Sequence, residues 1–137
     1  DDVLWFDGWP RAGTKVYLTE GEFDAMSLNV AGLAAGACGG KNVSEKQMGM
    51  LAACRVAISF DADKSGADAL NKLGAVFERF ADVKVTYVRP PTRYKDWNEM
   101  LIDAGPRVVR AYVEQNEKSF NGRWTANKLI FNSRLGA

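Results

Sequence analysis

The feature of the sequence that most constrains its fold is the alternation of short β-type runs with segments of helical spacing. The expected strands are residues 15–19, 33–37, 55–60 and 83–89. The expected helices are residues 22–31, 44–53, 66–80, 97–104 and 106–117. Because strands that alternate with helices form βα units, we predict an α/β fold of about four mostly parallel strands flanked by helices.

The same pattern divides the chain into successive parts. We expect an entry arm with aromatic residues over 1–14, a folded domain over 15–118, and a C-terminal tail or linker over 119–137. The tail contains three basic residues and no acidic ones. The sequence begins with Asp1 and not with Met, so we also expect a domain taken from a longer protein.

Composition excludes several classes of protein and of site. The 137 residues include 18 basic and 17 acidic ones, a balance that excludes a strongly basic nucleic-acid coat. The two cysteines are too few for a disulfide framework, so we expect a reduced, cytoplasmic setting. No apolar stretch is long enough for a membrane span. There is no histidine, which excludes a histidine base, a serine–histidine triad and a histidine-ligated zinc site within this chain. A metal site must therefore use carboxylates, which suit hard cations such as Mg²⁺ or Mn²⁺.

Acidic side chains follow two of the predicted strands. Glu20 comes directly after the first strand, and Asp61 and Asp63 come after the third. In an open parallel sheet, ligands gather at the carboxyl ends of the strands. In extended backbone the side chains of Asp61 and Asp63 point the same way, which is costly without a cation between them. Together with Glu20, these residues predict a site for one or two Mg²⁺ ions.

Glycines and lysines near these acids suit phosphate groups. Gly21 and Gly66 remove side-chain bulk where the chain turns from strand into helix. Gly66 also leaves backbone N–H groups near a helix N-terminus, which favours phosphate binding. Lys64 and Lys95 are candidates to hold phosphates as point charges.

Ordinary structural roles explain several of the same residues. Acids after strands are common as solvated loop residues and as helix N-caps. Asp24 lies in the first turn of its predicted helix, where the helix dipole alone favours an acid. Lys95 and Asp96 either contact phosphate and extend the acidic site, or form a charged turn that caps the next helix. Residue types alone leave these alternatives open.

Three short motifs carry a resemblance to a known family. They are Glu20-Gly21, Asp61-Ala-Asp63 followed by Gly66, and Lys95-Asp-Trp-Asn-Glu99. Together they resemble the Toprim domain, the catalytic module shared by topoisomerases, bacterial-type primases and certain nucleases. The resemblance covers about residues 15–117, and its motifs look most like those of the primase branch, especially bacteriophage primase–helicases. It implies a Toprim, Rossmann-like fold.

The resemblance also implies roles for individual residues. Glu20, Asp61 and Asp63 match the family's metal-binding acids, and Glu20 also matches its proposed general acid or base. Asp24 and Asp96 match further members of the metal site in primases. Where many relatives have one more acid, two residues after Asp96, this chain has an asparagine. We therefore expect no additional metal ligand at that position.

For function, the resemblance implies a DNA primase that makes RNA primers by Mg²⁺-dependent nucleotidyl transfer during replication, in a phage or mobile element. Its partners would be single-stranded DNA template and ribonucleoside triphosphates. Flanking zinc or helicase domains would be needed for activity, so we expect the chain alone to bind DNA weakly. Two alternatives stay open: a Toprim nuclease that hydrolyses phosphodiesters, and a non-catalytic module associated with nucleic acid. The intact acids argue against the non-catalytic module, and the Lys95-Asp96 pair favours primase over nuclease.

Overall fold

The strands form one mixed sheet whose centre is parallel. The computed structural model describes residues 5–6, 11–39, 51, 54–79 and 85–120. Its strands are β1 (Trp5–Phe6), β2 (Lys15–Thr19), β3 (Ala35–Ala37), β4 (Arg55–Ile58), β5 (Val85–Tyr87) and β6 (Lys118–Ser119). Their order in the sheet is β1-β3-β2-β4-β5-β6. The pairs among β3, β2, β4 and β5 are parallel, and β1 and β6 add antiparallel edges. The predicted α/β fold with a mostly parallel sheet is confirmed.

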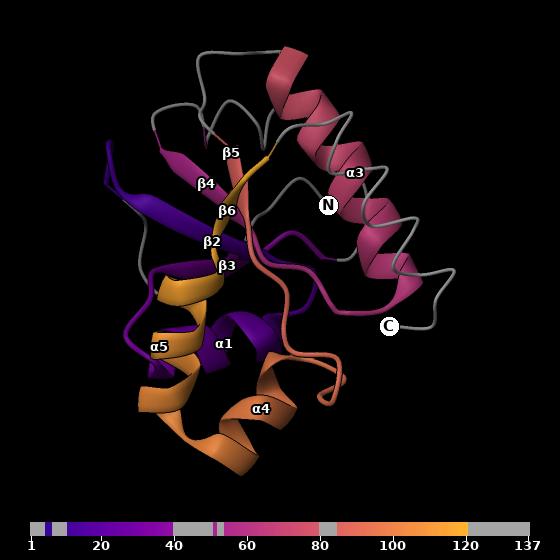
Figure 1. Cartoon of the computed structure of the whole chain (residues 1–137). Helices are drawn as coiled ribbons and strands as arrows, with labels where there is room; N and C mark the ends of the chain where they lie inside the picture. The colour runs from indigo at the N-terminus through magenta and orange to yellow at the C-terminus, as the bar shows by residue number, and fades with distance from the viewer. Residues whose placement is uncertain (1–4, 7–10, 40–50, 52–53, 80–84, 121–137) are drawn as a thin grey trace.

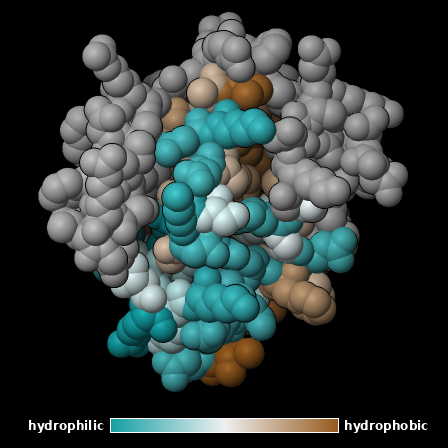
Figure 2. Space-filling view, turned by 90° about the vertical axis from the view of Figure 1, so that its right-hand side faces the viewer, coloured by the Kyte–Doolittle hydropathy of each residue, from teal (hydrophilic) through white to brown (hydrophobic). Residues whose placement is uncertain are grey.

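Helices cover both faces of this sheet (Figure 1). They are α1 (Glu22–Val30), α3 (Lys64–Arg79), α4 (Trp97–Ala104) and α5 (Pro106–Asn116). One buried cluster joins α3 to one face of the sheet, and a second cluster joins α1, α4 and α5 to the other face. Seen from the side that carries α3, the described surface is largely hydrophilic (Figure 2).

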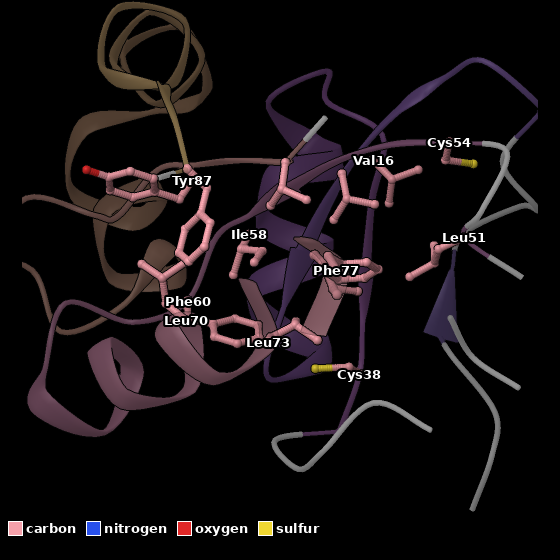
Figure 3. Packing of buried hydrophobic residues seen from close by; sticks show 14 of the residues in the cluster. Val16, Cys38, Leu51, Cys54, Ile58, Phe60, Leu70, Leu73, Phe77 and Tyr87 are labelled. Carbon is pink, nitrogen blue, oxygen red and sulfur yellow. The ribbon is translucent and has the colours of Figure 1, made fainter. Parts of the chain in front are cut away.

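The period-two geometry of the strands explains why both faces are buried. Successive side chains of a strand point to opposite faces, so a strand between two helical layers is apolar throughout. In β2, Val16 and Leu18 pack toward α3, whereas Tyr17 packs toward the other helices. In β4, Ile58 packs toward α3, whereas Ala57 packs toward the other helices. Figure 3 shows part of the cluster beside α3, in which Val16 and Ile58 lie close to side chains of that helix.

Local sequence signals set where α4 and α5 begin and end. The Asp96 carboxylate accepts a hydrogen bond from the Glu99 amide at 2.8 Å and so caps the N-terminus of α4. Gly105 ends α4 with a φ of +87°, a conformation that side-chain-bearing residues rarely adopt. Pro106 then opens α5, where its fixed φ suits the first helical turn.

Several predicted bounds differ from those observed. The helix predicted over 66–80 begins two residues earlier, at Lys64, because Asp63 caps it. The strand predicted over 33–37 is shorter and begins at Ala35. Residue 119, which the predicted division places in the tail, lies in β6, and the next residue, Phe120, is buried in the core. The helix predicted over 44–53 lies outside the described residues, apart from Leu51.

Within the described ranges, no helix combines the length and the apolar character that a membrane crossing requires.

Candidate active site

The predicted acids meet at the carboxyl ends of the two central strands. Glu20 follows β2 directly, and Asp61 lies three residues beyond the end of β4. Because β2 and β4 are parallel neighbours, with Leu18 opposite Ile58, their following residues emerge side by side. The Asp61 amide donates a hydrogen bond to Glu20 Oε1 at 3.4 Å. The expected convergence of these two motifs is therefore seen in the fold.

Asp63 serves as the cap of α3. Its Oδ1 atom accepts a hydrogen bond from the Gly66 amide at 2.7 Å, which fixes the turn from β4 into the helix. The chain bends at this point, so Asp61 and Asp63 engage different partners instead of projecting in parallel from extended backbone. The Gly66 amide expected to face phosphate is thus already bonded within the loop.

The absence of a side chain at Gly66 is a steric requirement of the loop. A Cβ atom added there would lie 2.1 Å from the carbonyl oxygen of Asp61. Gly21 differs, since a Cβ atom built on it would meet no atom within 4 Å. Of the two glycines, Gly66 alone is needed for the backbone packing seen here.

Asp24 brings α1 and α4 into the site. Its Oδ1 atom accepts a hydrogen bond from the Asn98 amide at 3.1 Å, and its carboxyl group lies close enough to Asp61 for the charge of that residue to raise its pKa. The Ser27 hydroxyl contacts Asn98 Oδ1 at 3.2 Å and adds a second link between the two helices. Asp24, offered by the sequence as either a dipole-stabilised acid or a site member, therefore lies against Asp61.

The third motif lies beside this pair. The charges of Asp96 and Lys95 both act on Asp61, the first raising its pKa and the second lowering it. Asp96 also caps α4, so the same residue both caps a helix and lies near the acids of the site. Lys95 is exposed, and Lys64 is exposed at the first turn of α3.

The acids raise one another's affinity for protons. Burial raises the pKa of Asp24 to about 7, against the opposing hydrogen bond from Asn98, and the negative charges of Asp61 and Asp96 add to the rise. Burial also raises the pKa of Asp61, and the charge of Asp63 contributes further. The pKa of Glu20 is raised for the same reasons, by burial first and then by the charges of Asp61 and Asp63.

Sequence reasoning missed Arg89, which follows β5 at the same edge of the sheet. Its guanidinium donates hydrogen bonds to the carbonyl oxygen of Asp61 from Nε at 3.3 Å and from Nη2 at 2.8 Å. Nη2 also donates to the carbonyl oxygen of Asp63 at 2.6 Å. The strand-end argument that found the acids applies equally to a cation after β5, and would have found this residue.

Trp97 fixes α4 against the end of β4. Its side chain is fully buried, and its Nε1–H donates to the carbonyl oxygen of Ser59 at 2.8 Å. The ring also packs against Tyr112 of α5, with the ring centroids 6.0 Å apart. This anchor holds the third motif close to the acids of the first two.

The oxygen-rich chemistry of the site fits a hard cation better than a softer metal. Glu20, Asp24 and Asp61 are partly or wholly buried carboxylic acids, and none of them takes part in the ion pairs recorded among the described residues. Across the parts of the chain that the structure describes, no three acidic or cysteine side chains stand arranged as a finished metal-binding group. The donor set is therefore suitable, although Glu20 and Asp24 each accept a hydrogen bond from a backbone amide.

Comparisons with known proteins agree on one family. Residues 17–101 match the family described as Toprim-like. A DNA primase of Mycoplasma pneumoniae is 28% identical over 134 residues, an alignment that covers 85% of this chain and 22% of that protein.

Solved primase structures share the fold. The Aquifex aeolicus primase structure, which contains zinc-binding and RNA polymerase domains, is 25% identical with a TM-score of 0.61, and the match covers 75% of this chain and 26% of that one. The DnaG primase catalytic domain bound to single-stranded DNA is 21% identical with a TM-score of 0.62, over 87% of this chain and 37% of that one. The chain thus spans well under half the length of each of these relatives.

Proposed function

Because the chain belongs to the Toprim-like family, we propose that it is the catalytic Toprim domain of a DNA primase. The predicted resemblance to bacterial-type primases is confirmed by the relatives. One observation carries the proposal: the acids of the first two motifs, which lie inside the matched region, meet at adjacent strand ends. The reaction we propose is nucleotidyl transfer from ribonucleoside triphosphates onto an RNA primer, templated by single-stranded DNA during replication.

In this reaction the primer 3′-hydroxyl oxygen forms a bond to the α-phosphorus of the incoming nucleotide, and the bond from that phosphorus to pyrophosphate breaks. Glu20 accepts the hydroxyl proton as a general base, because its carboxylate lies directly after β2 at the strand ends where the reacting groups would meet. Lys64 and Lys95, which are exposed beside the acids, hold phosphate oxygens as point charges. Gly21 leaves open space next to Glu20 for a phosphate to approach.

Glu20, Asp24, Asp61, Asp63 and Asp96 are the residues that would hold Mg²⁺ or Mn²⁺. When bound, such an ion lowers the pKa of the attacking hydroxyl and balances charge on the leaving pyrophosphate. The closeness of Asp24 and Asp61 supports this assignment, because like charges that lie close together in a partly buried site are relieved by a cation.

Partners and setting belong to this proposal, and the relatives support the template and the zinc domain. A solved DnaG catalytic domain is bound to single-stranded DNA, and the Aquifex aeolicus primase structure includes a zinc-binding domain. We propose single-stranded DNA as template, flanking zinc or helicase domains that grip it, and a cytoplasmic replication protein of a phage or mobile element.

The test is primer synthesis by the full-length protein with ribonucleoside triphosphates, single-stranded DNA and Mg²⁺. Asp61→Ala and Asp63→Ala should each reduce the rate by at least about a hundredfold, the scale expected when a metal site that supplies charge stabilisation is lost. Asp68→Ala is the matched control, because Asp68 is an exposed acid on α3. Its rate should equal that of the wild type.

Other outcomes separate the alternatives. Full primer synthesis by both Asp61→Ala and Asp63→Ala would contradict metal ligation by these residues. Template degradation by the wild type, lost in the same variants, would identify a Toprim nuclease instead. Neither product from the wild type would favour a non-catalytic module that associates with nucleic acid.

A further inference from the structure

The side chain of Arg89 binds backbone carbonyl oxygens of the loop that carries Asp61 and Asp63. The loop from Asp61 to Asp63 presents two carbonyl oxygens to one guanidinium group, at distances between 2.6 and 3.3 Å. Among the ion pairs recorded for the described residues, none joins Arg89 to a carboxylate. The arginine therefore fixes the main chain of the loop and leaves the carboxylate oxygens to other partners.

The Asp61 carbonyl is held from two sides. Arg89 binds its oxygen, and the Cα of Gly66 lies so close that a Cβ there would come within 2.1 Å of the same oxygen. Arg89 is itself held, because its own carbonyl oxygen accepts a hydrogen bond from the Tyr112 hydroxyl at 2.8 Å. A chain of contacts thus runs from α5 through the end of β5 to the acidic loop.

The guanidinium also supplies a fixed positive charge to the site. The negative charges of Asp63, Asp61 and Glu20 act on it, while burial opposes its ionised form. Arginine keeps its proton under such conditions, so the charge is permanent at neutral pH. A half-buried cation beside these three acids, two of them partly buried, reduces their mutual repulsion without occupying their oxygens.

We propose that Arg89 is a positioning residue for the metal-binding acids: it holds the Asp61–Asp63 loop through two carbonyl oxygens, so that the carboxylates are arranged in advance for a divalent cation. The proposal rests on the proposed function for its metal, but the holding of the loop is a separate, measurable property. The fork geometry matters, because Nε and Nη2 together reach oxygens that one ammonium group cannot reach in the same way.

The experiment compares Arg89→Gln, Arg89→Lys and the control Arg93→Gln in the 137-residue chain. Arg93 is a matched control because it is an exposed arginine after the same strand, and its guanidinium contacts Tyr94 instead of the loop. Two quantities are measured for each protein. One is the Mn²⁺ dissociation constant from titration followed by electron paramagnetic resonance, and the other is amide hydrogen exchange over residues 61–66 in metal-free protein.

We expect Arg89→Gln to weaken Mn²⁺ binding by about 10- to 100-fold, the range typical for loss of a residue that orients metal ligands. Arg89→Lys keeps the charge but loses the fork, so its affinity should fall between those of Arg89→Gln and the wild type. Both variants should exchange faster over residues 61–66, with far-ultraviolet circular dichroism unchanged. Arg93→Gln should match the wild type in both measurements.

Two results would overturn the proposal. Exchange over residues 61–66 that is unchanged in both Arg89 variants would show that the loop does not depend on Arg89. Unchanged Mn²⁺ affinity would show that the loop's position does not govern the metal. If the wild type binds no Mn²⁺, the proposed function fails, and hydrogen exchange alone then decides whether Arg89 holds the loop.

Discussion

Asp61 faces a different partner with each of its polar groups. Its amide donates to Glu20, its carbonyl oxygen accepts from Arg89, and its carboxyl group lies near that of Asp24, whose pKa its charge raises. A single residue thus joins the strand ends of β2, β4 and β5 to the start of α1. Substitution of Asp61 removes only its side chain and keeps the amide and carbonyl contacts, so the packing around its carbonyl oxygen is better probed at Gly66, whose Cα lies beside that oxygen.

Replacing Gly66 by alanine should destabilise the loop. The new Cβ would lie 2.1 Å from the Asp61 carbonyl oxygen, so the backbone must shift. We expect a loss of about 1–3 kcal/mol in the free energy of unfolding, the usual cost of overpacking, although alanine is the better helix former. Chemical denaturation measures it. Gly21→Ala, with open space around its Cβ, should stay within about 0.5 kcal/mol of the wild type; equal stability of the two variants would contradict the argument.

Residue types predicted the acids of the site but not their contacts. Glu20 and Asp61 were found because a charge placed after a buried strand must lie at the sheet's edge. The contacts of Arg89 were missed because they use backbone carbonyl oxygens, which every residue has and which no sequence pattern marks. The contact of Asp63 with the Gly66 amide is the helix-capping role that the sequence offered as the ordinary alternative for an acid after a strand.

At the scale of elements, strong local signals located the bounds well. The strand at Lys15–Thr19 and the helix at Trp97–Ala104 were predicted at both ends, because apolar runs and a capping acid mark them. β1 and β6 were not predicted as strands, since each has two residues and forms only by pairing with a neighbour already in place. Tertiary pairing, not local preference, creates such edges.

Trp97 links the helix of the third motif to the strand of the second, and Trp97→Phe should loosen that link. The variant leaves the buried Ser59 carbonyl oxygen without its donor and removes part of a fully buried ring. We expect a loss of about 2–4 kcal/mol, the sum of an unpaired buried acceptor and a small cavity. The denaturation midpoint in urea measures it.

Tyr94→Phe is the matched control for this substitution. It also removes one aromatic hydrogen-bond donor beside α4, but the Tyr94 hydroxyl meets Asp103, whose side chain is 66% exposed and can turn to water. Its loss should be smaller than about 1 kcal/mol. A larger loss in Tyr94→Phe than in Trp97→Phe would show that the Ser59 contact does not anchor α4.

At the scale of the whole molecule, the acids near the two ends of the strands differ in how their negative charge is balanced. Beyond the carboxyl ends of β2 and β4, the acids of the site lie close together and raise one another's pKa. At the start of β2, the Lys15 ammonium donates to Glu117 at 2.6 Å, and Tyr17 and Thr86 hydroxyls each donate to the same carboxylate at 2.8 Å. The fold therefore satisfies its buried carboxylate at Glu117 and leaves the acids at the strand ends in mutual repulsion, where a cation can relieve them.

Glu117→Gln should therefore lower the stability of the whole domain in a pH-dependent way. Burial alone would raise the pKa of Glu117, but hydrogen bonds from Lys15, Thr86 and Tyr17 outweigh it, and the pKa is lowered in the folded state. A lowered folded pKa gives stability that is present above the unfolded value of 4.5 and is lost as pH falls through the folded value. We expect the wild type to exceed the variant by about 1–3 kcal/mol at pH 7, with the difference shrinking below pH 4.5. Urea denaturation from pH 7 to pH 3 measures this difference.

Glu114→Gln is the control for this substitution. It removes an exposed ion pair with Arg110 and should cost no more than about 0.5 kcal/mol. A difference between Glu117→Gln and wild type that stays constant over this pH range would show that the Glu117 charge does not stabilise the fold.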